Sequence, residues 1–195
     1  MDNNGVSMKV QQTRHMIAAS FMELLKGIPF RKVSINDICE SALIGRSTFY
    51  LHFEDKYQLL RYCMEEEANR WLVAAKNMTA EDAISYALDS ILENRNFYHH
   101  IITGDSNAEE IGILHSIFTR IFTERLVEKE RAGCALPGPV SILGAFYAGG
   151  IVSANNQWIQ RDFDIPKEVM VACQKSCCPV CLNKRIGRVN LCRFR

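Results

Sequence analysis

The chain has 195 residues and a formal net charge of +1 at pH 7, from 23 Lys and Arg against 22 Asp and Glu. A near-neutral chain is not a general coat for nucleic acid, so any contact with DNA must come from a local patch. The length suits one small domain plus a second helical domain with a buried core. Residues 1–61 hold eight Lys or Arg and six Asp or Glu, a mild local excess of +2.

Nothing in the sequence predicts a secreted or membrane protein. Residues 1–12 are polar and contain no apolar segment of a secretory signal. The most apolar stretch, Ile142 to Val152, is shorter than the roughly 20 residues that span a bilayer. We therefore expect a cytoplasmic protein in which Cys39, Cys63 and Cys134 are reduced, partly buried thiols.

Helical patterns dominate the chain, and no convincing alternating strand pattern is present. A first helix is predicted from about Lys9 to Lys26, and Gly27 and Pro29 end it. Its apolar stripe has the three- and four-residue spacing of an amphipathic helix and consists of Ile17, Phe21, Leu24 and Leu25.

Two short helices follow. Ser34 and Asp37 have the spacing of a capping box at the start of the second helix. Ile44 and Gly45 form a turn, and a third helix runs from about Arg46 to His52. A fourth helix is predicted from Glu54 to about Asn77, with acidic residues at its positive N-terminus, and is long enough to connect two domains.

The sequence pattern of the second half of the chain also predicts helices. Helices are predicted at about 80–93, up to about 103, at about 108–131 and 140–160, and after Pro166. We expect a dimerisation and effector domain at 57–170 and a Cys-rich basic tail of uncertain order at 171–195.

Residues 34–57 are the most informative part of the sequence. The third helix carries hydrogen-bonding side chains opposite Phe49, namely Arg46, Ser47, Thr48, Tyr50 and His52. Such side chains suit phosphate oxygens and base edges, and the layout is that of a helix-turn-helix that reads DNA. The alternative is a helical hairpin whose helices only pack and do not contact DNA.

Lys56 lies in the first turn of the fourth helix, where its charge opposes the helix dipole. A nearby phosphate would remove this conflict.

The segments Ser34-Ile-Asn-Asp37-Ile38-Cys39 and Thr48-Phe49-Tyr50-Leu51-His52-Phe53-Glu54-Asp55-Lys56 resemble the N-terminal domain of the TetR family of bacterial transcription regulators. That family typically shows T/S-x-x-D-I-A, a turn, and T-F/L-Y-x-H/Y-F-x-x-K. The match covers roughly the first third of the chain. It implies an all-α fold with an N-terminal three-helix helix-turn-helix DNA-binding domain, placed here at 8–56, and a helical C-terminal domain.

The resemblance also implies roles for single residues. Arg46, Ser47 and Thr48 would meet base edges or adjacent phosphates. Tyr50 and His52 would touch the DNA backbone, Lys56 would hold a phosphate, and Ser34 would cap the second helix beside the DNA. Two positions depart from the family pattern. Leu43 stands where the turn glycine usually is, and would be strained at a positive φ, and Gly45 replaces the usual Ser or Thr cap.

The C-terminal half resembles, at low specificity, a TetR subgroup that contains dihydroxyacetone-kinase activators, which act with a protein partner. The resemblance lies in Phe97-Tyr98 and in Phe146-Tyr147-Ala148-Gly149-Gly150 followed by Trp158. We predict that an effector pocket is lined by His115, Phe118, Phe122, Tyr147 and Trp158, although a plain aromatic core explains these residues equally well.

A face of small residues permits close approach of a second helix and consists of Gly144, Ala145, Ala148, Gly149 and Ser153. We predict that it is the dimer interface, since a two-fold dimer matches two DNA half-sites; packing within one chain is the alternative.

No metal or cofactor site is predicted. Adjacent His99 and His100 point to different faces of a helix and make a poor joint site. The tail holds five cysteines, Cys173, Cys177, Cys178, Cys181 and Cys192, but only one clean CxxC. No paired carboxylates, nucleophile–base set or phosphate-binding loop indicates an enzyme.

We therefore predict a homodimeric regulator that binds a palindromic operator in double-stranded DNA and is a repressor released by a small-molecule effector. The alternative is a co-activator or adaptor whose C-terminal domain binds a partner protein.

Overall fold

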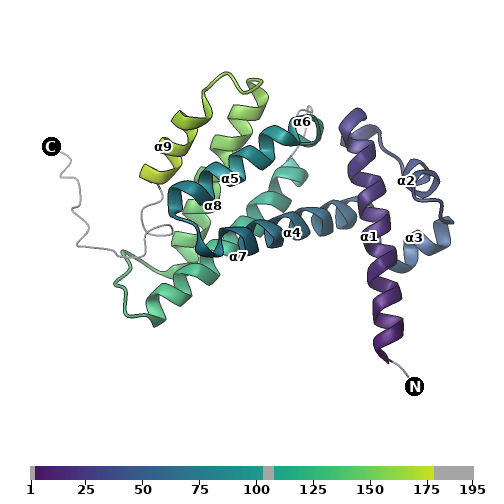
Figure 1. Ribbon diagram of the computed structural model, residues 1–195, viewed down its shortest axis with the longest axis horizontal. Coiled ribbons are helices and arrows are strands. Elements are labelled where there is room, and N and C mark those ends of the chain that lie inside the picture. The colour runs from purple at the N-terminus through teal and green to yellow at the C-terminus, as the bar shows by residue number, and fades with distance from the viewer. Residues whose placement is uncertain (1–2, 103–107, 178–195) are drawn as a thin grey trace.

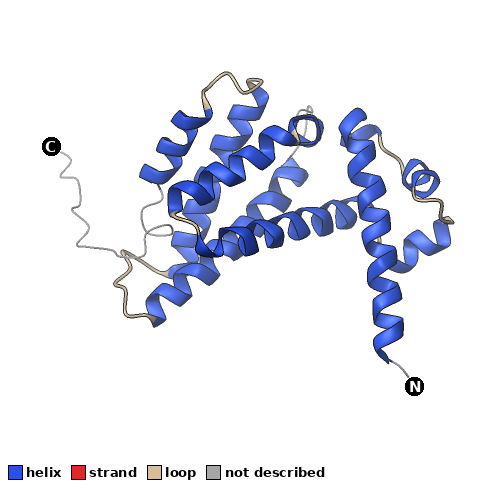
Figure 2. Ribbon diagram, in the orientation of Figure 1, coloured by secondary structure: helices blue, strands red, loops and turns tan. Residues whose placement is uncertain are grey.

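The computed structural model describes residues 3–102 and 108–177, and within those ranges every regular element is a helix (Figure 2). In chain order these are α1 Asn3–Gly27, η1 Phe30–Lys32, α2 Ile35–Ser41, α3 Arg46–His52, α4 Lys56–Ala74, η2 Ala75–Asn77, α5 Ala80–Glu93, α6 Arg95–Ile102, α7 Ala108–Arg131, α8 Val140–Gln160 and α9 Lys167–Cys177. The predicted all-α fold class is confirmed. None of these helices is long and apolar enough to cross a bilayer.

The N-terminal unit packs α2 and α3 against one side of α1, at one end of the molecule (Figure 1). The apolar stripe of α1 is fully buried at Ile17, Phe21 and Leu25 and half-buried at Leu24. It meets Ile38 of α2 and Phe49 of α3, which are also fully buried. Burial of each such side chain stabilises the unit by roughly 1.5–3 kcal/mol, and this packing fixes the orientation of the short α3.

Helix α4 leads away from this unit into the helical body (Figure 1). Asp55 caps it by accepting a hydrogen bond from Gln58 N at 2.7 Å. The α-helix ends at Ala74 and tightens into η2, so the predicted end near Asn77 includes a 3₁₀ turn.

The helical body contains α5 to α9. Helices α7 and α8 pack along each other, and α5 packs on α9. Trp158 of α8 lies between the two pairs, 1% exposed, and its indole Nε1 donates to Ile165 O at 2.7 Å. A buried indole N–H needs such a partner, so this bond places the loop before α9.

The two units share one apolar core. The main cluster runs from Ile17 of α1 through Phe97 and Ile101 of α6 to Ile113 and Ile117 of α7. Helix α1 contacts α6, and α4 contacts α7. The N-terminal unit is therefore packed directly on the helical body.

Two ends differ from the sequence expectation. Helix α1 begins at Asn3 rather than near Lys9, and α9 continues to Cys177, into the predicted tail. Cys173 and Cys177 are exposed on α9. Cys178, Cys181 and Cys192 lie outside the described residues.

Candidate nucleic-acid interface and ligand cavity

Helix α3 presents polar side chains and Leu51, which is 82% exposed, because its two phenylalanines are anchored inward. Phe49 is fully buried, and Phe53 at the end of the helix is 1% exposed. Arg46, Ser47 and Tyr50 lie on the exposed side, whereas Thr48 and His52 are half-buried. Gly45 is the N-cap and offers no side-chain hydrogen bond. The free backbone N–H groups of the first turn therefore lie beside exposed Arg46 and Ser47.

The turn before α3 has the left-handed backbone that its family pattern requires. Leu43 has φ 53° and its side chain is 93% exposed. The turn is closed by hydrogen bonds from Leu43 N to Glu40 O at 3.2 Å and from Ile44 N to Cys39 O at 3.0 Å. A leucine in this conformation costs roughly 1–2 kcal/mol, so the predicted strain is confirmed.

Ser34 is held inside the predicted capping box, which the structure confirms. Its Oγ accepts from Asp37 N at 3.2 Å and donates to Asp37 Oδ2 at 2.8 Å, and its own N–H donates to the same oxygen at 2.8 Å. These bonds from the Ser34 backbone and side chain lower the pKa of the Asp37 carboxyl. The hydroxyl therefore serves the helix cap.

Lys56 does not extend freely into solvent. Its Nζ donates to Phe30 O at 3.0 Å, Arg31 O at 3.1 Å and Val33 O at 2.9 Å, and lies 4.7 Å from the centre of the Phe30 ring. These bonds use the ammonium's full set of three donors. The family resemblance predicted that Lys56 would contact a DNA phosphate. In this structure Lys56 instead links the start of α4 to η1 through these hydrogen bonds.

A cavity of about 400 Å³ lies between α4, α5, α6, α7 and α8. Of the five residues predicted to line a pocket, Phe118 and Phe122 line it. Trp158 instead packs against Phe163, with ring centres 5.0 Å apart. Tyr147 packs in the cluster around Leu126. His115 is absent from the lining and hydrogen-bonds Thr119 Oγ1 at 3.5 Å.

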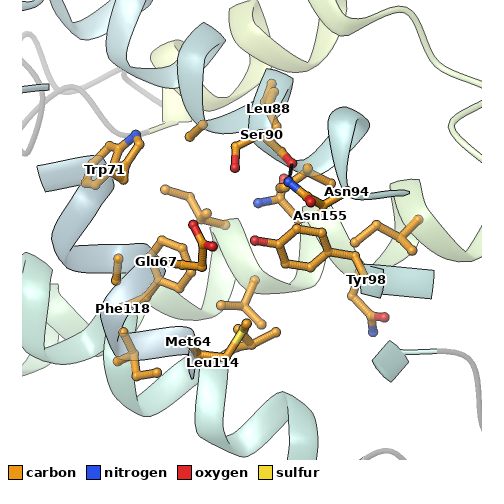
Figure 3. A pocket seen from close by; sticks show the side chains of 18 of the residues that line it. Met64, Glu67, Trp71, Leu88, Ser90, Asn94, Tyr98, Leu114, Phe118 and Asn155 are labelled. Atoms are coloured by element: carbon orange, nitrogen blue, oxygen red, sulfur yellow. Dashed lines mark hydrogen bonds between the residues drawn. The ribbon is translucent and has the colours of Figure 1, made fainter. Parts of the chain in front are cut away.

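The polar residues that line this cavity were not predicted from the sequence. Glu67, Tyr98, Asn155 and Ser90 surround its centre, with the Tyr98 hydroxyl and the Glu67 carboxylate both pointing into it (Figure 3). The signal in the sequence was the Asn155-Asn156 pair in the apolar α8. The contributions of α4 and α6 had no local signal because they depend on how the helices cross.

The predicted small-residue face of α8 divides between two sides of the helix. Gly144 and Ala148 are buried against α7 of the same chain, and a Cβ on Gly144 would lie 3.3 Å from Thr119 O. A second chain therefore cannot reach these two residues. Ala145 and Gly149 are half-buried, and Ser153 is exposed. The exposed side carries two large apolar side chains, Ile142 and Phe146, 66% and 70% exposed.

These features together define a helix-turn-helix protein with an exposed polar reading helix and a cavity in an all-helical second unit. Family models agree with that description. The model described as "Bacterial regulatory proteins, tetR family" matches residues 18–63, and that of a "Transcriptional regulator C-terminal region" matches 78–173.

Solved structures share the fold. A TetR transcriptional regulator from Streptococcus agalactiae superposes with a TM-score of 0.63 at 20% identity, over 90% of this chain and 98% of that one. RolR in complex with resorcinol superposes with a TM-score of 0.59 at 19% identity, over 88% and 89%.

A curated relative is the HTH-type dhaKLM operon transcriptional activator DhaS of Lactococcus lactis subsp. lactis, 26% identical over 103 residues. That match spans 52% of this chain and 55% of the relative, about half the length of each. The chain belongs to the TetR family of bacterial transcription regulators, and it is a DNA-binding regulator.

Proposed function

We propose that the chain is a homodimeric repressor whose affinity for its operator falls when a small molecule occupies the cavity between α4 and α8. The observation that carries the proposal is the position of α4. Its middle part lines the cavity through Met64 and Glu67, and its first residue, Lys56, holds the carbonyls of η1 next to the helix-turn-helix. A shift of α4 on ligand binding would move the N-terminal unit of α1 to α3, which carries the helix-turn-helix and is the reading unit.

The proposed DNA contacts are assigned to the polar side chains of α3 that are exposed to solvent. Arg46 and Ser47 at the start of α3 would meet base edges, and Tyr50 would meet a phosphate. Gly45 lets the backbone approach DNA closely, and half-buried Thr48 and His52 would contribute at the edge of the interface. Ser34 and Lys56 support the unit through the capping contacts above. The partner is a palindromic duplex with half-sites about one helical turn apart.

The dimer would form through the exposed side of α8 and the neighbouring side of α9. Phe146 and Ile142 on α8 and Val169 on α9, 54% exposed, are large apolar side chains at the surface. Such an unpartnered apolar side favours burial against a second copy. Ser153 lies on the same exposed side, so part of the small-residue face stays in the proposed interface.

The chain would act by binding and not by catalysis. It would act in the cytoplasm, where the bacterial chromosome is. An activator or adaptor is the second candidate, because the curated relative is an activator. An open cavity favours the effector-controlled repressor, since a protein partner needs a surface groove rather than an interior space.

The test begins with an unbiased selection of bound DNA sequences, followed by operator binding in the presence of candidate ligands. A cavity-filling variant, Leu114→Trp, should bind the operator but lose the ligand response. Leu136→Trp, at a half-buried position outside the cavity lining, is the matched control and should keep it. A ligand response that survives in Leu114→Trp would reject the cavity as the effector site.

A further inference from the structure

The cavity lining contains a buried hydrogen-bond acceptor without a donor and a carboxylate oxygen that no described residue contacts. The Oε1 of Glu67 accepts from Arg70, and its Oε2 accepts from no described residue. The Oδ1 of Asn156 is shielded from solvent and has no donor. The Oδ1 of Asn155 already accepts from Gln174 Nε2 at 2.7 Å. A buried acceptor without a donor costs free energy, so a ligand that supplies a donor beside Asn156 would be favoured here.

Three charged side chains line the cavity, Glu67, Arg70 and Glu93. The carboxylate of Glu67 is 27% exposed and pairs with Arg70, whose side chain is 69% exposed at the rim. Burial and the neighbouring Glu67 raise the pKa of Tyr98, so its hydroxyl stays protonated and neutral. Glu93 is exposed at the rim, where water screens its charge. A charged ligand would therefore bring a charge that has no buried partner in the cavity.

The remaining lining is apolar. Met64, Leu114 and Phe118 lie beside and below Glu67, and Tyr98 points toward them from the other side (Figure 3). The volume of about 400 Å³ falls in the range of small-molecule sites, roughly 300–1,000 Å³. The cavity therefore suits a hydrocarbon body that carries a hydrogen-bonding end.

We propose that the cavity binds an uncharged alcohol or phenol, with its hydroxyl directed at Glu67, Tyr98 and Asn156 and its hydrocarbon body against Leu114 and Phe118. This inference rests on the proposed effector site and adds the chemical class of the ligand. The ligand hydroxyl has one proton, which it shares between Glu67 Oε2 and Asn156 Oδ1, and the Tyr98 hydroxyl can donate to the oxygen of the ligand.

The test uses four probes that share a tolyl body and differ only in the polar end. These are para-cresol, para-methylanisole, the para-toluate anion and the para-methylbenzylammonium cation. Binding is measured on the full-length protein by titration calorimetry up to the solubility limit of each probe, and by the shift in melting temperature. Para-cresol should bind at least about tenfold more tightly than each of the others, the effect of one hydrogen bond to a charged group.

Variants locate the contact. Glu67→Leu and Asn156→Leu should each weaken para-cresol by about tenfold and leave weak binding of para-methylanisole unchanged. Glu93→Gln, a carboxylate at the exposed rim, is the matched control and should leave both unchanged. Thermal melts of each variant show that it is folded, and Tyr98→Phe provides an independent loss of a hydroxyl in the same group.

Three results would overturn the inference: para-methylanisole binding as tightly as para-cresol, either ion binding more tightly, or no probe binding at all. The proposed function fails separately. If para-cresol binds as expected but neither it nor any larger phenol changes operator affinity, the ligand chemistry stands and the effector role is rejected. If a charged compound releases the operator through the cavity, the function stands and the ligand class is wrong.

Discussion

Three backbone carbonyls converge on the ammonium of Lys56, and Phe30 O also accepts from Val33 N at 3.2 Å. Burial lowers the pKa of Lys56, while the buried carboxylate of Glu110 acts in the opposite direction. A lysine that donates to three carbonyls is part of the fold of the reading unit. Replacing Lys56 should therefore lower the free energy of unfolding, and any effect on the affinity for DNA should follow from that loss of stability.

Replacing Lys56 by Met should lower the free energy of unfolding by about 2 kcal/mol, because three carbonyls lose a charged donor. Urea unfolding measures this. The control is Lys32→Met, an exposed lysine of η1, which should change stability by less than about 0.5 kcal/mol. Weaker operator binding by Lys56→Met at unchanged stability would instead assign the residue to a phosphate.

The capping box predicts a pH dependence. The folded-state pKa of Asp37 is lowered by its bonds to Ser34. Its contribution to stability is therefore fully present above the unfolded pKa of about 3.9 and is lost as the pH falls through the folded pKa. Asp37→Asn should be less stable than the wild type at pH 7, and the difference should shrink below about pH 4. Urea unfolding across this range tests it, and Ser34→Ala should reproduce the effect. A difference that is constant with pH would contradict the cap.

At the scale of single helices, α8 has two apolar sides with different partners. One side holds Gly144 and Ala148 against α7, and the other exposes Ile142 and Phe146. The sequence pattern grouped small residues from both sides. Their roles separate only when α7 occupies one of the two sides.

Gly144→Ala should destabilise the fold by about 1–3 kcal/mol, because its Cβ would lie within 3.3 Å of Thr119 O and Thr123 N, which are backbone atoms. Gly112→Ala in α7 is the matched control. It has no atom within 4 Å of the added Cβ and should stabilise by up to about 1 kcal/mol. Thermal unfolding compares the two, and equal effects would show that α7 and α8 are packed less closely.

Phe146→Glu should give a monomer that keeps its helicity, because a carboxylate would have to be buried in the proposed dimer interface. Light scattering measures the mass, and circular dichroism measures the helicity. Arg120→Glu, an exposed position on α7, is the control and should remain a dimer. A dimeric Phe146→Glu would move the interface to another face.

At the scale of the whole molecule, a buried carboxylate joins the two units. Glu110, in the first turn of α7, is 1% exposed, and its Oε1 lies 3.6 Å from Arg31 Nη2 of η1. Neither carboxylate oxygen makes a hydrogen bond. The positive N-terminus of α7, Arg31 and Lys56 balance its charge. The contact therefore lies between the cavity-bearing body and the reading unit.

Glu110→Gln should loosen this junction. Amide hydrogen exchange in η1 and in the first turn of α7 should both become faster, by about tenfold if one charged contact is lost. Mass spectrometry of peptides covering residues 30–33 and 108–113 measures it. Glu109→Gln, exposed beside it, is the control. Faster exchange in α7 alone would mean that the carboxylate does not join the two units.

The features that depend on neighbours along the chain were predictable from residue types and spacing. The capping box at Ser34 and the bounds of α3, α7 and α8 are set by local hydrogen bonding and by helical periodicity, and the structure confirms them. Leu43, which stands where the family usually has glycine, does have the positive φ at which it would be strained. The family pattern in residues 34–56 is also local, which is why the helix-turn-helix could be identified from residue types and spacing.

Which helix faces meet could not be predicted from local patterns, because it depends on contacts between distant segments. The cavity draws Glu67 from α4, Tyr98 from α6 and Asn155 from α8, residues that no spacing along the chain connects. Lys56 reaches carbonyls more than 20 residues earlier in the chain, and Gly144 faces inward because α7 lies against it. These outcomes depend on how helices cross, and helix crossing is set by the packing of side chains from distant segments.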